Sequence, residues 1–315
     1  MDFDVTRRKV AIIGAGFVGA SIAYALTIRR LAREIVLIDI DEKKTEGEAL
    51  DIQHGIPDMG ISSVRAGSYS DCRDCDLIII TAGRNRRPGE TRLDLIAGNS
   101  RILRNVVDQL KPHYTRGVIM MVSNPVDVLV YQCARWMDLP NGMVFGTGCI
   151  LDTSRLTRLI ADYTHLNTEV VKTTIVGEHG DAQTPIWSRT SIAGVPIQEY
   201  CENVGLAWTE KERVRLSDKV RTMGGVIIRD KGKTHYGIAT CVCYLAQAVL
   251  NQRLTIAPVS TVFRGEYGIE GVALSVPSII GVNGVEKRLE ERWAEEEFKA
   301  FRAAADKMKK AVSLL

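Results

Sequence analysis

The stretch KVAIIGAGFVGA at residues 9–20 decides the fold of this chain. A short apolar run ends at Gly14, and the pattern Gly-Ala-Gly-Phe-Val-Gly then opens a segment with helical periodicity. A strand, a glycine turn and a helix in this order are the context that the GxGxxG pattern of a dinucleotide-binding unit requires. Glycines let the backbone approach a pyrophosphate, which lies at the helix N-terminus and its unpaired N–H groups.

The acid that completes this pattern is Asp39, at the end of the next apolar run. A carboxylate there is expected to bind the hydroxyls of the adenine ribose and to repel a 2′-phosphate, which favours NAD over NADP. The competing interpretation is a glycine turn that serves only helix–sheet packing. The predicted NAD-binding residues are Gly14, Gly16, Phe17, Val18, Gly19 and Asp39.

Further apolar runs of strand length follow, separated in several places by helical segments such as residues 93–110. Apolar strands that alternate with helices predict a parallel sheet covered on both faces. After about residue 148 the order of elements becomes mixed. We therefore predict an α/β protein, with a doubly wound Rossmann sheet at residues 1–148 and an α+β substrate domain at residues 149–315. The additional predicted strands are residues 34–39, 76–83, 117–124 and 143–148.

Composition excludes several classes of protein. The net charge of +3 is small for a nucleic-acid-binding protein. No apolar run has the length of a signal peptide core or a membrane span, so the cytoplasm is the expected location. Seven cysteines at irregular spacings argue against a disulfide framework. Cys72 and Cys75 form a lone CxxC without the second pair that zinc needs, so we expect them to be inert and predict no metal site.

Seven motifs occur in the order seen in the lactate/malate dehydrogenase superfamily, which the chain resembles over about residues 8–312. Taken as a whole, the sequence most resembles bacterial L-lactate dehydrogenases. The resemblance implies hydride transfer between NAD and the C2 carbon of a 2-oxo or 2-hydroxy acid, and assembly as a homotetramer or a dimer. The motifs are GAGFVG, LIDID, TAG…PGETRLDL, SNPVD, LDTSRL, GEHGD and KGKTHYGIA.

Among the five histidines, His179 lies in the glycine-flanked segment that matches the family's catalytic loop. Histidine suits proton transfer because its ordinary pKa lies near neutrality. The resemblance implies that Asp152 fixes the tautomer of this histidine and that Arg155 holds the substrate carboxylate. It also implies that Arg92 polarises the reacting carbonyl and that Asn124 binds substrate and cofactor near the nicotinamide. On spacing alone, Asp152 and Arg155 are more typical of a surface ion pair.

The expected substrate depends on Arg86, which stands where the family selects its substrate. Lactate dehydrogenases typically carry Gln there, and malate dehydrogenases carry Arg, which pairs with a second carboxylate. Because a buried guanidinium without an anionic partner is costly, we predict a malate dehydrogenase on a lactate-type scaffold. Glu90, Thr91 and Thr234, of which the last is predicted to bind substrate, resemble the lactate branch. L-lactate dehydrogenase is therefore the alternative.

Thr157 and Arg189 stand where many bacterial lactate dehydrogenases bind an activating sugar bisphosphate through an Arg and a His. Because both residues differ from that pattern, this activation is not expected. Two other classes remain as alternatives. A catalytically silent NAD-binding protein would not need an acid–base pair. A sugar-nucleotide enzyme on the same fold would carry a Tyr-x-x-x-Lys pair, which is not found at the position that such chemistry needs.

Overall fold

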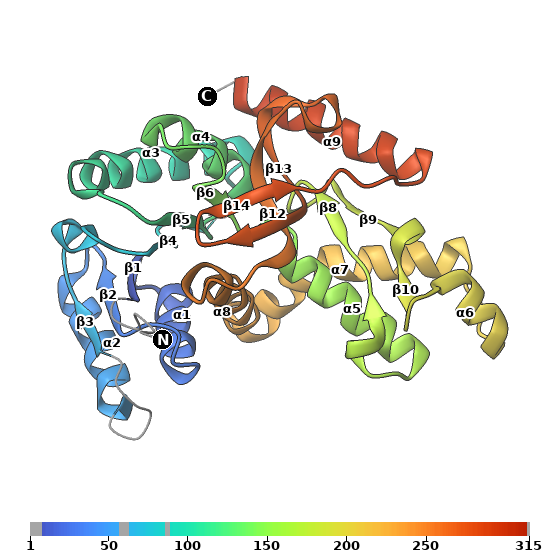
Figure 1. The fold of residues 1–315 in the computed structure, drawn as a ribbon, viewed down its shortest axis with the longest axis horizontal. Helices are drawn as coiled ribbons and strands as arrows, with labels where there is room; N and C mark the ends of the chain where they lie inside the picture. Colours follow the sequence, from blue (N-terminus) through green and yellow to red (C-terminus); the bar gives the residue numbers. More distant parts are fainter. Residues whose placement is uncertain (1–7, 57–62, 86–88, 314–315) are drawn as a thin grey trace.

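The computed structural model describes residues 8–56, 63–85 and 89–313, and in them one long sheet runs through both halves of the chain (Figure 1). In the first half the strands are parallel and lie in the order β3-β2-β1-β4-β5-β6. This arrangement confirms the predicted α/β fold with a Rossmann sheet. The strands are β1 (Lys9–Ile13), β2 (Glu34–Ile38), β3 (Ser63–Ala66), β4 (Leu77–Ile80), β5 (Val118–Met121) and β6 (Val144–Gly146).

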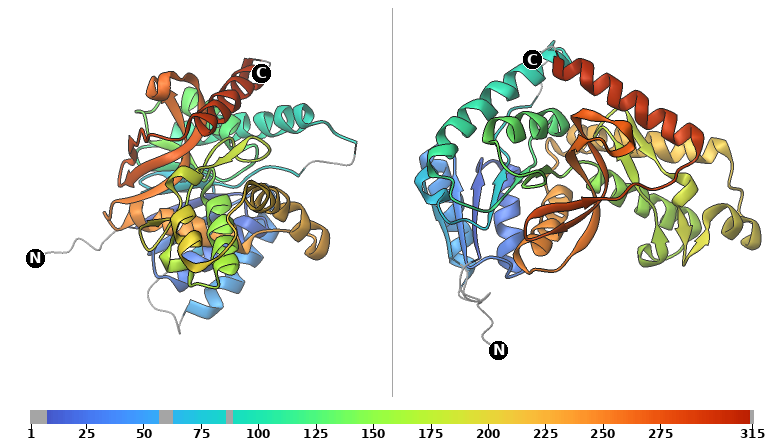
Figure 2. Two further views of the ribbon diagram at one scale, coloured as in Figure 1. Left: turned by 90° about the vertical axis from the view of Figure 1, so that its right-hand side faces the viewer. Right: turned by 45° about the horizontal axis from the view of Figure 1, so that its top comes forward.

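Consecutive residues of the parallel strands pack on opposite faces of the sheet. In β1, Val10 and Ile12 belong to a core shared with α1, α2 and α8, whereas Ala11 and Ile13 belong to a core shared with α3 and α4. Figure 2 shows helices on both sides of the sheet. Because both faces are buried, each strand is apolar throughout, which is why the sequence shows unbroken apolar runs. The helices of this half are α1 (Phe17–Ile28), α2 (Glu42–Gly55), α3 (Arg92–Leu110) and α4 (Val126–Met137).

The second half extends the same sheet with antiparallel strands. β12 pairs with β6 through Ser260 and Gly146, and β13 pairs with β8 through Ser275 and Gly177. A small second sheet has the order β11-β10-β7. The strands are β7 (Val171–Lys172), β8 (Ile175–Gly177), β9 (Gln183–Pro185), β10 (Ser191–Ile192), β11 (Val195–Pro196), β12 (Thr255–Arg264), β13 (Glu270–Gly281) and β14 (Gly284–Arg288). The helices are α5 (Ile150–Thr164), α6 (Ile197–Val204), α7 (Glu210–Lys231), α8 (Tyr236–Leu250) and α9 (Glu295–Ser313).

Helix α8 was not predicted from the sequence. It belongs to the second half but packs on α1 and completes the core on one face of the parallel sheet. A helix in this position is apolar on most sides, so its sequence lacks the alternation of an apolar and a polar face that indicates a surface helix. Because strands from both sides of residue 148 form one sheet, and α8 packs on a helix of the first half, the division of the chain into domains at that residue stays a prediction.

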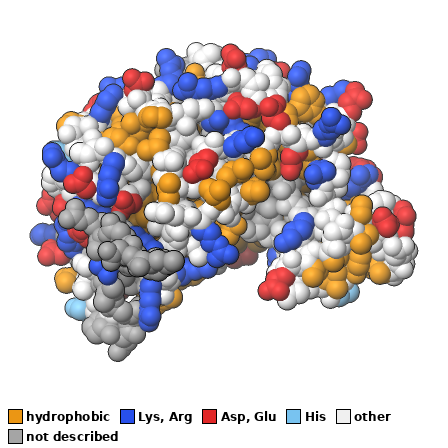
Figure 3. All heavy atoms as spheres, in the orientation of Figure 1, with side chains coloured by type: hydrophobic (Ala, Val, Ile, Leu, Met, Phe, Trp, Pro, Cys, Tyr) orange, Lys and Arg blue, Asp and Glu red, His pale blue; other side chains and the backbone are white. Residues whose placement is uncertain are grey.

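Two smaller differences from the expected elements have local causes. Strand β3 has no apolar run, because it lies at the sheet edge, where Arg65 forms an ion pair of 2.8 Å with Glu34 of β2. The terminal helix α9, which a run of charged residues from about Glu290 predicts, begins five residues later, at Glu295. On the face seen in Figure 3, basic and acidic side chains are interspersed. Within the described ranges, no helix is long and apolar enough to cross a membrane.

Gly19 and Gly47 provide a matched test of the strand–helix approach. A Cβ at Gly19 would lie 1.9 Å from the carbonyl oxygen of Gly14, whereas a Cβ at Gly47 on α2 would meet nothing within 4 Å. We expect Gly19→Ala to lower the free energy of unfolding by about 1–3 kcal/mol or more. Gly47→Ala should raise it by about 0.5–1 kcal/mol, since alanine is the better helix former. Urea denaturation measures both free energies of unfolding. Equal values for the two variants would contradict the close approach of Gly19 to the carbonyl oxygen of Gly14.

Candidate active site

The glycine turn places the N-terminus of α1 at the carboxyl edge of the sheet. Gly14 has a φ of +107°, and a Cβ there would lie 2.6 Å from both Ala82 N and Thr81 Oγ1. Thr81 Oγ1 donates a hydrogen bond of 2.7 Å to the carbonyl oxygen of Gly14 and so ties the turn to the end of β4. By contrast, a Cβ at Gly16 would meet nothing within 4 Å. The turn is therefore closely packed at Gly14 and open at Gly16.

Asp39 lies beside this turn. Its Oδ2 accepts a hydrogen bond of 2.7 Å from the backbone N–H of Ala15, and its Oδ1 accepts one of 3.3 Å from Asp41 N. The N-cap residue of α1 is Gly16, and no described side chain caps this helix. The first N–H groups of α1 consequently remain available to an anion, with a carboxylate next to the turn. This arrangement has the features that the dinucleotide pattern predicted.

Residues between α7 and α8 approach the same turn from the second half of the chain. The ring of Phe17 is 51% exposed, and Lys233 Nζ lies 3.3 Å from its centroid. His235 is buried, shares a hydrogen bond of 2.9 Å between Nδ1 and Ser21 Oγ, and lies with its ring centroid 5.8 Å from that of Phe17. Thr234, half-buried, precedes this histidine and therefore lies near the glycine turn. Sequence reasoning missed Lys233 and His235, because neither belongs to the GxGxxG pattern.

A second group of predicted site residues lies where the loop between β8 and β9 meets the first turn of α5. His179 Nδ1 lies 2.6 Å from Asp152 Oδ2, and Arg155 Nη1 lies 3.1 Å from Asp152 Oδ1. The side chains of Asp152, Arg155 and His179 are 4%, 13% and 25% exposed. The structure thus brings together the three residues that the sequence proposed, and their burial excludes an ordinary surface ion pair. With Nδ1 directed at the carboxylate, Nε2 is the ring nitrogen left to face a substrate.

The two partners change each other's proton affinity. Burial alone would lower the pKa of His179, but the charge of Asp152 and the hydrogen bond to it outweigh this effect and raise that pKa. Burial alone would raise the pKa of Asp152, but the charge and hydrogen bond of His179, together with Arg155, lower it. The pair therefore favours a charged imidazolium next to a charged carboxylate, which is the state of a group ready to donate a proton.

Asn124 lies exposed at the end of β5, and its peptide bond to Pro125 is cis. Asn99 of α3 donates a hydrogen bond of 2.6 Å from Nδ2 to the carbonyl oxygen of Asn124 and one of 3.1 Å to that of Arg84. Asp127, in the first turn of α4, accepts a hydrogen bond of 2.8 Å from the backbone N–H of His179. Asn99 and Asp127 are buried residues that sequence reasoning missed, although Asp127 belongs to the quoted motif SNPVD.

The loop between β4 and α3, which contains Arg84 and Arg86, is described in part. Arg84 Nη1 forms an ion pair of 2.5 Å with Glu90 Oε2 across the loop, and its backbone N–H donates to Asn99 Oδ1 at 2.9 Å. Arg86 lies outside the described residues. Arg92 is the first residue of α3, and its side chain lies outside the described part of the structure. The predictions for these two side chains consequently stay predictions.

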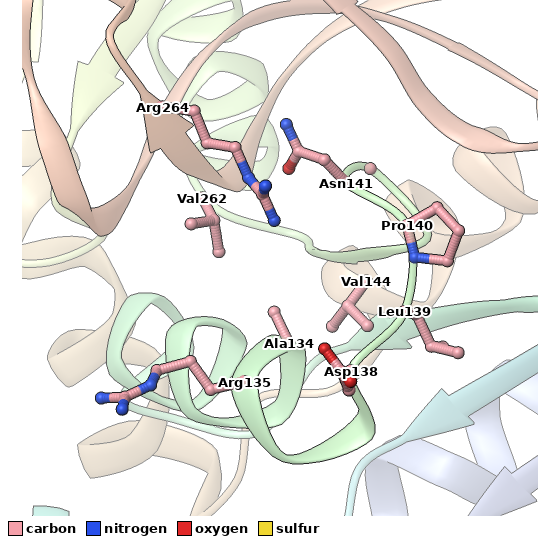
Figure 4. A pocket seen from close by; sticks show the side chains of 10 residues that line it. Ala134, Arg135, Asp138, Leu139, Pro140, Asn141, Val144, Val262 and Arg264 are labelled. Carbon is pink, nitrogen blue, oxygen red and sulfur yellow. The ribbon is translucent and has the colours of Figure 1, made fainter.

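Two surface hollows lie away from His179. The first, at the end of α4, has a volume of about 270 Å³; Arg264 points into it and Arg135 points away (Figure 4). None of the predicted site residues lines it. The second has a volume of about 480 Å³ and is lined by Thr157 and Arg189 together with Lys172. The two positions singled out in the sequence thus share one hollow, and the absence of bisphosphate activation stays a prediction.

Comparisons with known proteins agree with this geometry over the whole chain. Residues 8–146 match the family described as lactate/malate dehydrogenase, NAD binding domain, and residues 149–314 match its alpha/beta C-terminal domain. The chain is 36% identical to the L-lactate dehydrogenase of Acetivibrio thermocellus over 98% of this chain and 97% of that protein. It is 40% identical to the L-lactate dehydrogenase of a Thermoanaerobacter species, over 98% and 99%. The crystal structure of a minor L-lactate dehydrogenase from Enterococcus mundtii is similar with a TM-score of 0.94, at 39% identity and 98% coverage of both chains.

These relatives contradict the predicted malate dehydrogenase and favour the alternative, L-lactate dehydrogenase. Relatives that align over nearly the whole chain carry the lactate name, and so do similar solved structures. The malate prediction is therefore wrong. It depended on the charge of Arg86 alone, and it assumed that this side chain faces the substrate. A sequence shows which charge a loop carries, but it does not show the direction in which a long side chain points.

The ion pair of Asp152 predicts a specific dependence of stability on pH. Since folding raises the pKa of His179 above 6.5, its contribution is fully present below that pH and is lost as the pH rises through the folded pKa. Since folding lowers the pKa of Asp152 below 3.8, its contribution is present above that pH and is lost on acidification. The pair therefore stabilises the fold most between these two pH values.

We expect Asp152→Asn to lower the free energy of unfolding by about 1–3 kcal/mol at pH 6, because it leaves the partly buried cations of Arg155 and His179 with a weaker partner. The loss should be smaller at pH 9 than at pH 6, because a smaller fraction of His179 is charged at the higher pH. The control is Asp162→Asn, which breaks an exposed pair with Arg158 on the same helix and should change stability by less than about 0.5 kcal/mol. Urea denaturation at both pH values decides; a loss independent of pH would contradict the role of His179.

Proposed function

The chain belongs to the lactate/malate dehydrogenase family, and from this premise we propose that it interconverts pyruvate and L-lactate. As a member of this family it is an NAD-dependent oxidoreductase of 2-hydroxy acids. The observation that carries the lactate proposal is the hydrogen-bonded pair of His179 and Asp152 beside Arg155, in a chain that aligns end to end with L-lactate dehydrogenases.

The residues at the glycine turn fit NAD. Gly16 leaves open space where any side chain would stand, and the uncapped N-terminus of α1 offers N–H groups and a partial positive charge to the pyrophosphate. Asp39 is placed to bind ribose hydroxyls, and its negative charge would repel a 2′-phosphate. We propose that Phe17 and Val18 contribute the first N–H groups of the helix. When bound, the reduced cofactor supplies the hydride.

The acid–base step follows from the state of His179. As an imidazolium, His179 donates its Nε2 proton to the keto oxygen of pyruvate, and the neutral ring remains hydrogen-bonded to Asp152 through Nδ1. In lactate oxidation the neutral ring accepts the hydroxyl proton at the same nitrogen. Asp152 stabilises the imidazolium and holds the ring in one orientation. Its own proton affinity is low, so it does not compete for the proton.

Arg155 is proposed to bind the carboxylate of pyruvate. Its Nη1 is directed at Asp152, and a Cβ at Gly224 of α7 would lie 3.6 Å from its Nη2. The glycine therefore leaves room beside the guanidinium for a small acid. We further propose that Asn124 binds substrate and cofactor at the end of β5, that Thr234 contacts the substrate, and that Arg92 polarises the keto group. Pyruvate has a methyl group where malate has its second carboxylate, so the proposal gives Arg86 no contact.

The organisation of the molecule is also proposed. Residues 1–148 bind the cofactor, and residues 149–315 carry the acid–base pair. A homo-oligomer, a tetramer or a dimer, is supported by large apolar side chains that are about half exposed on three helices packed together, Tyr24 of α1, Leu50 of α2 and Tyr244 of α8. A cytoplasmic location is supported by the seven cysteines, all of which are free and buried.

The substrate proposal is tested by NADH oxidation at neutral pH with pyruvate and with oxaloacetate. We expect kcat/KM to be at least about tenfold higher for pyruvate, because the site binds a single carboxylate. In the His179→Gln control, kcat should fall about 10²–10⁴-fold, since the proton donor is lost, while NADH still binds. That control excludes turnover by a contaminating enzyme. A preference for oxaloacetate would contradict the proposal.

The cofactor site is tested by Gly16→Ala. The added methyl group meets no protein atom, so the melting temperature should stay unchanged, but it enters the space proposed for the pyrophosphate. We expect the Kd of NADH, measured by fluorescence titration, to rise about tenfold, or about 1.4 kcal/mol. Gly47→Ala, on the exposed side of α2, serves as the control with unchanged affinity. An unchanged Kd in Gly16→Ala would place the pyrophosphate elsewhere.

A further inference from the structure

Asp127 is a buried acid that the proposed reaction does not use. It lies in the first turn of α4, 2% exposed, three residues after Asn124. Its Oδ2 accepts a hydrogen bond of 2.8 Å from the backbone N–H of His179, and its Oδ1 accepts one of 2.6 Å from the hydroxyl of Ser260 on β12. A carboxylate is costly to bury unless hydrogen bonds satisfy it. The N-terminus of α4 also favours a negative charge at this position.

These contacts attach three segments to one side chain. Asp127 belongs to α4, His179 to the loop after β8, and Ser260 to the strand that joins the two halves of the sheet. Gly177 and Gly180, on either side of His179, have φ values of +91° and +135°, which other residue types rarely adopt. A glycine-flanked loop needs an external attachment to hold one conformation. Asp127 supplies it at the backbone, while Asp152 holds the ring.

We propose that Asp127 is a positioning residue for the reaction, which fixes the backbone of the loop that carries His179 and places a second buried negative charge near its imidazole. This inference rests on the proposed function, in which His179 transfers the proton. It adds to that function a residue that touches neither substrate nor cofactor. Its effect reaches the reaction through the position of His179 and through the pH range in which that ring is charged.

The charges around His179 come from several elements of the described structure. Helix α5 contributes Asp152 and Arg155, and α4 contributes Asp127. Asp152 and Asp127 favour the imidazolium, and Arg155 opposes it. Glu178 precedes His179 in the same segment and faces Lys307 of α9 at 3.8 Å, and Asp181 follows two residues later. Because pyruvate reduction needs the imidazolium, the charge of Asp127 extends the reaction toward higher pH.

Asparagine is the substitution that separates charge from shape. In Asp127→Asn, the amide oxygen can still accept the N–H of His179, and the amide NH₂ can donate to the Ser260 hydroxyl, which is able to rotate and accept. Both hydrogen bonds are thus retained while the negative charge is removed. Asp127→Ser removes the charge in a smaller side chain and serves if the asparagine variant does not fold.

The decisive measurement is the pH profile of kcat/KM for pyruvate. We expect Asp127→Asn to lower kcat/KM about tenfold at pH 8.5 and less than about twofold at pH 6, because fewer molecules carry the imidazolium at high pH. The control is Val128→Ala, the next residue of α4, which is buried in a neighbouring core cluster. It should lower the melting temperature without moving the profile. Profiles of Asp127→Asn and the unmodified protein that run parallel would overturn the proposal.

A second readout separates this inference from the proposed function. If the unmodified protein does not reduce pyruvate, the proposed function fails, but the titration of His179 followed by NMR still tests Asp127. A His179 titration displaced to lower pH in Asp127→Asn supports the inference whatever the substrate. An unchanged titration overturns it, even if pyruvate is the substrate.

Discussion

The hydrogen bond between His179 Nδ1 and Asp152 Oδ2 is the interaction around which the rest of the molecule is arranged. It joins a short loop after β8 to the first turn of α5, and it is strongest while both partners are charged. A buried carboxylate would normally take up a proton, and a buried imidazole would normally lose one. Each partner prevents this in the other, and Arg155 adds a permanent positive charge beside Asp152.

The long sheet holds the two ends of this interaction in place relative to the cofactor turn. β5 and β6 deliver Asn124 and the start of α5 at one edge, and β12 and β13 connect them to β8 and the loop of His179. Asp127 forms a second connection between the same segments. Helix α8, which starts beside Thr234 and His235, closes the core around α1 at the other end. Proton donor and cofactor turn are therefore parts of one packed body.

The prediction of the substrate was wrong because it depended on one residue, Arg86. Arg86 carries the charge that suits a dicarboxylate, yet relatives over the whole chain are L-lactate dehydrogenases. Partners decide what a charge does: Arg84, two positions before Arg86, forms an ion pair with Glu90 of the same loop. A charge acts on a substrate only if its side chain faces the pocket. That direction depends on packing around the loop, which the residue type does not determine.

The sequence by itself determined what depends on neighbours along the chain. The glycine turn, the apolar strands that alternate with helices, and the facing of Asp152 and Arg155 on one helix all follow from short-range periodicity and spacing. Only the tertiary structure decided which distant groups meet. Asp127 and His179 are 52 residues apart, and Ser21 and His235 are 214 apart. Helix α8, the edge strand β3 and the burial of Asp127 escaped prediction for the same reason, since each depends on contacts between distant segments, which no local pattern encodes.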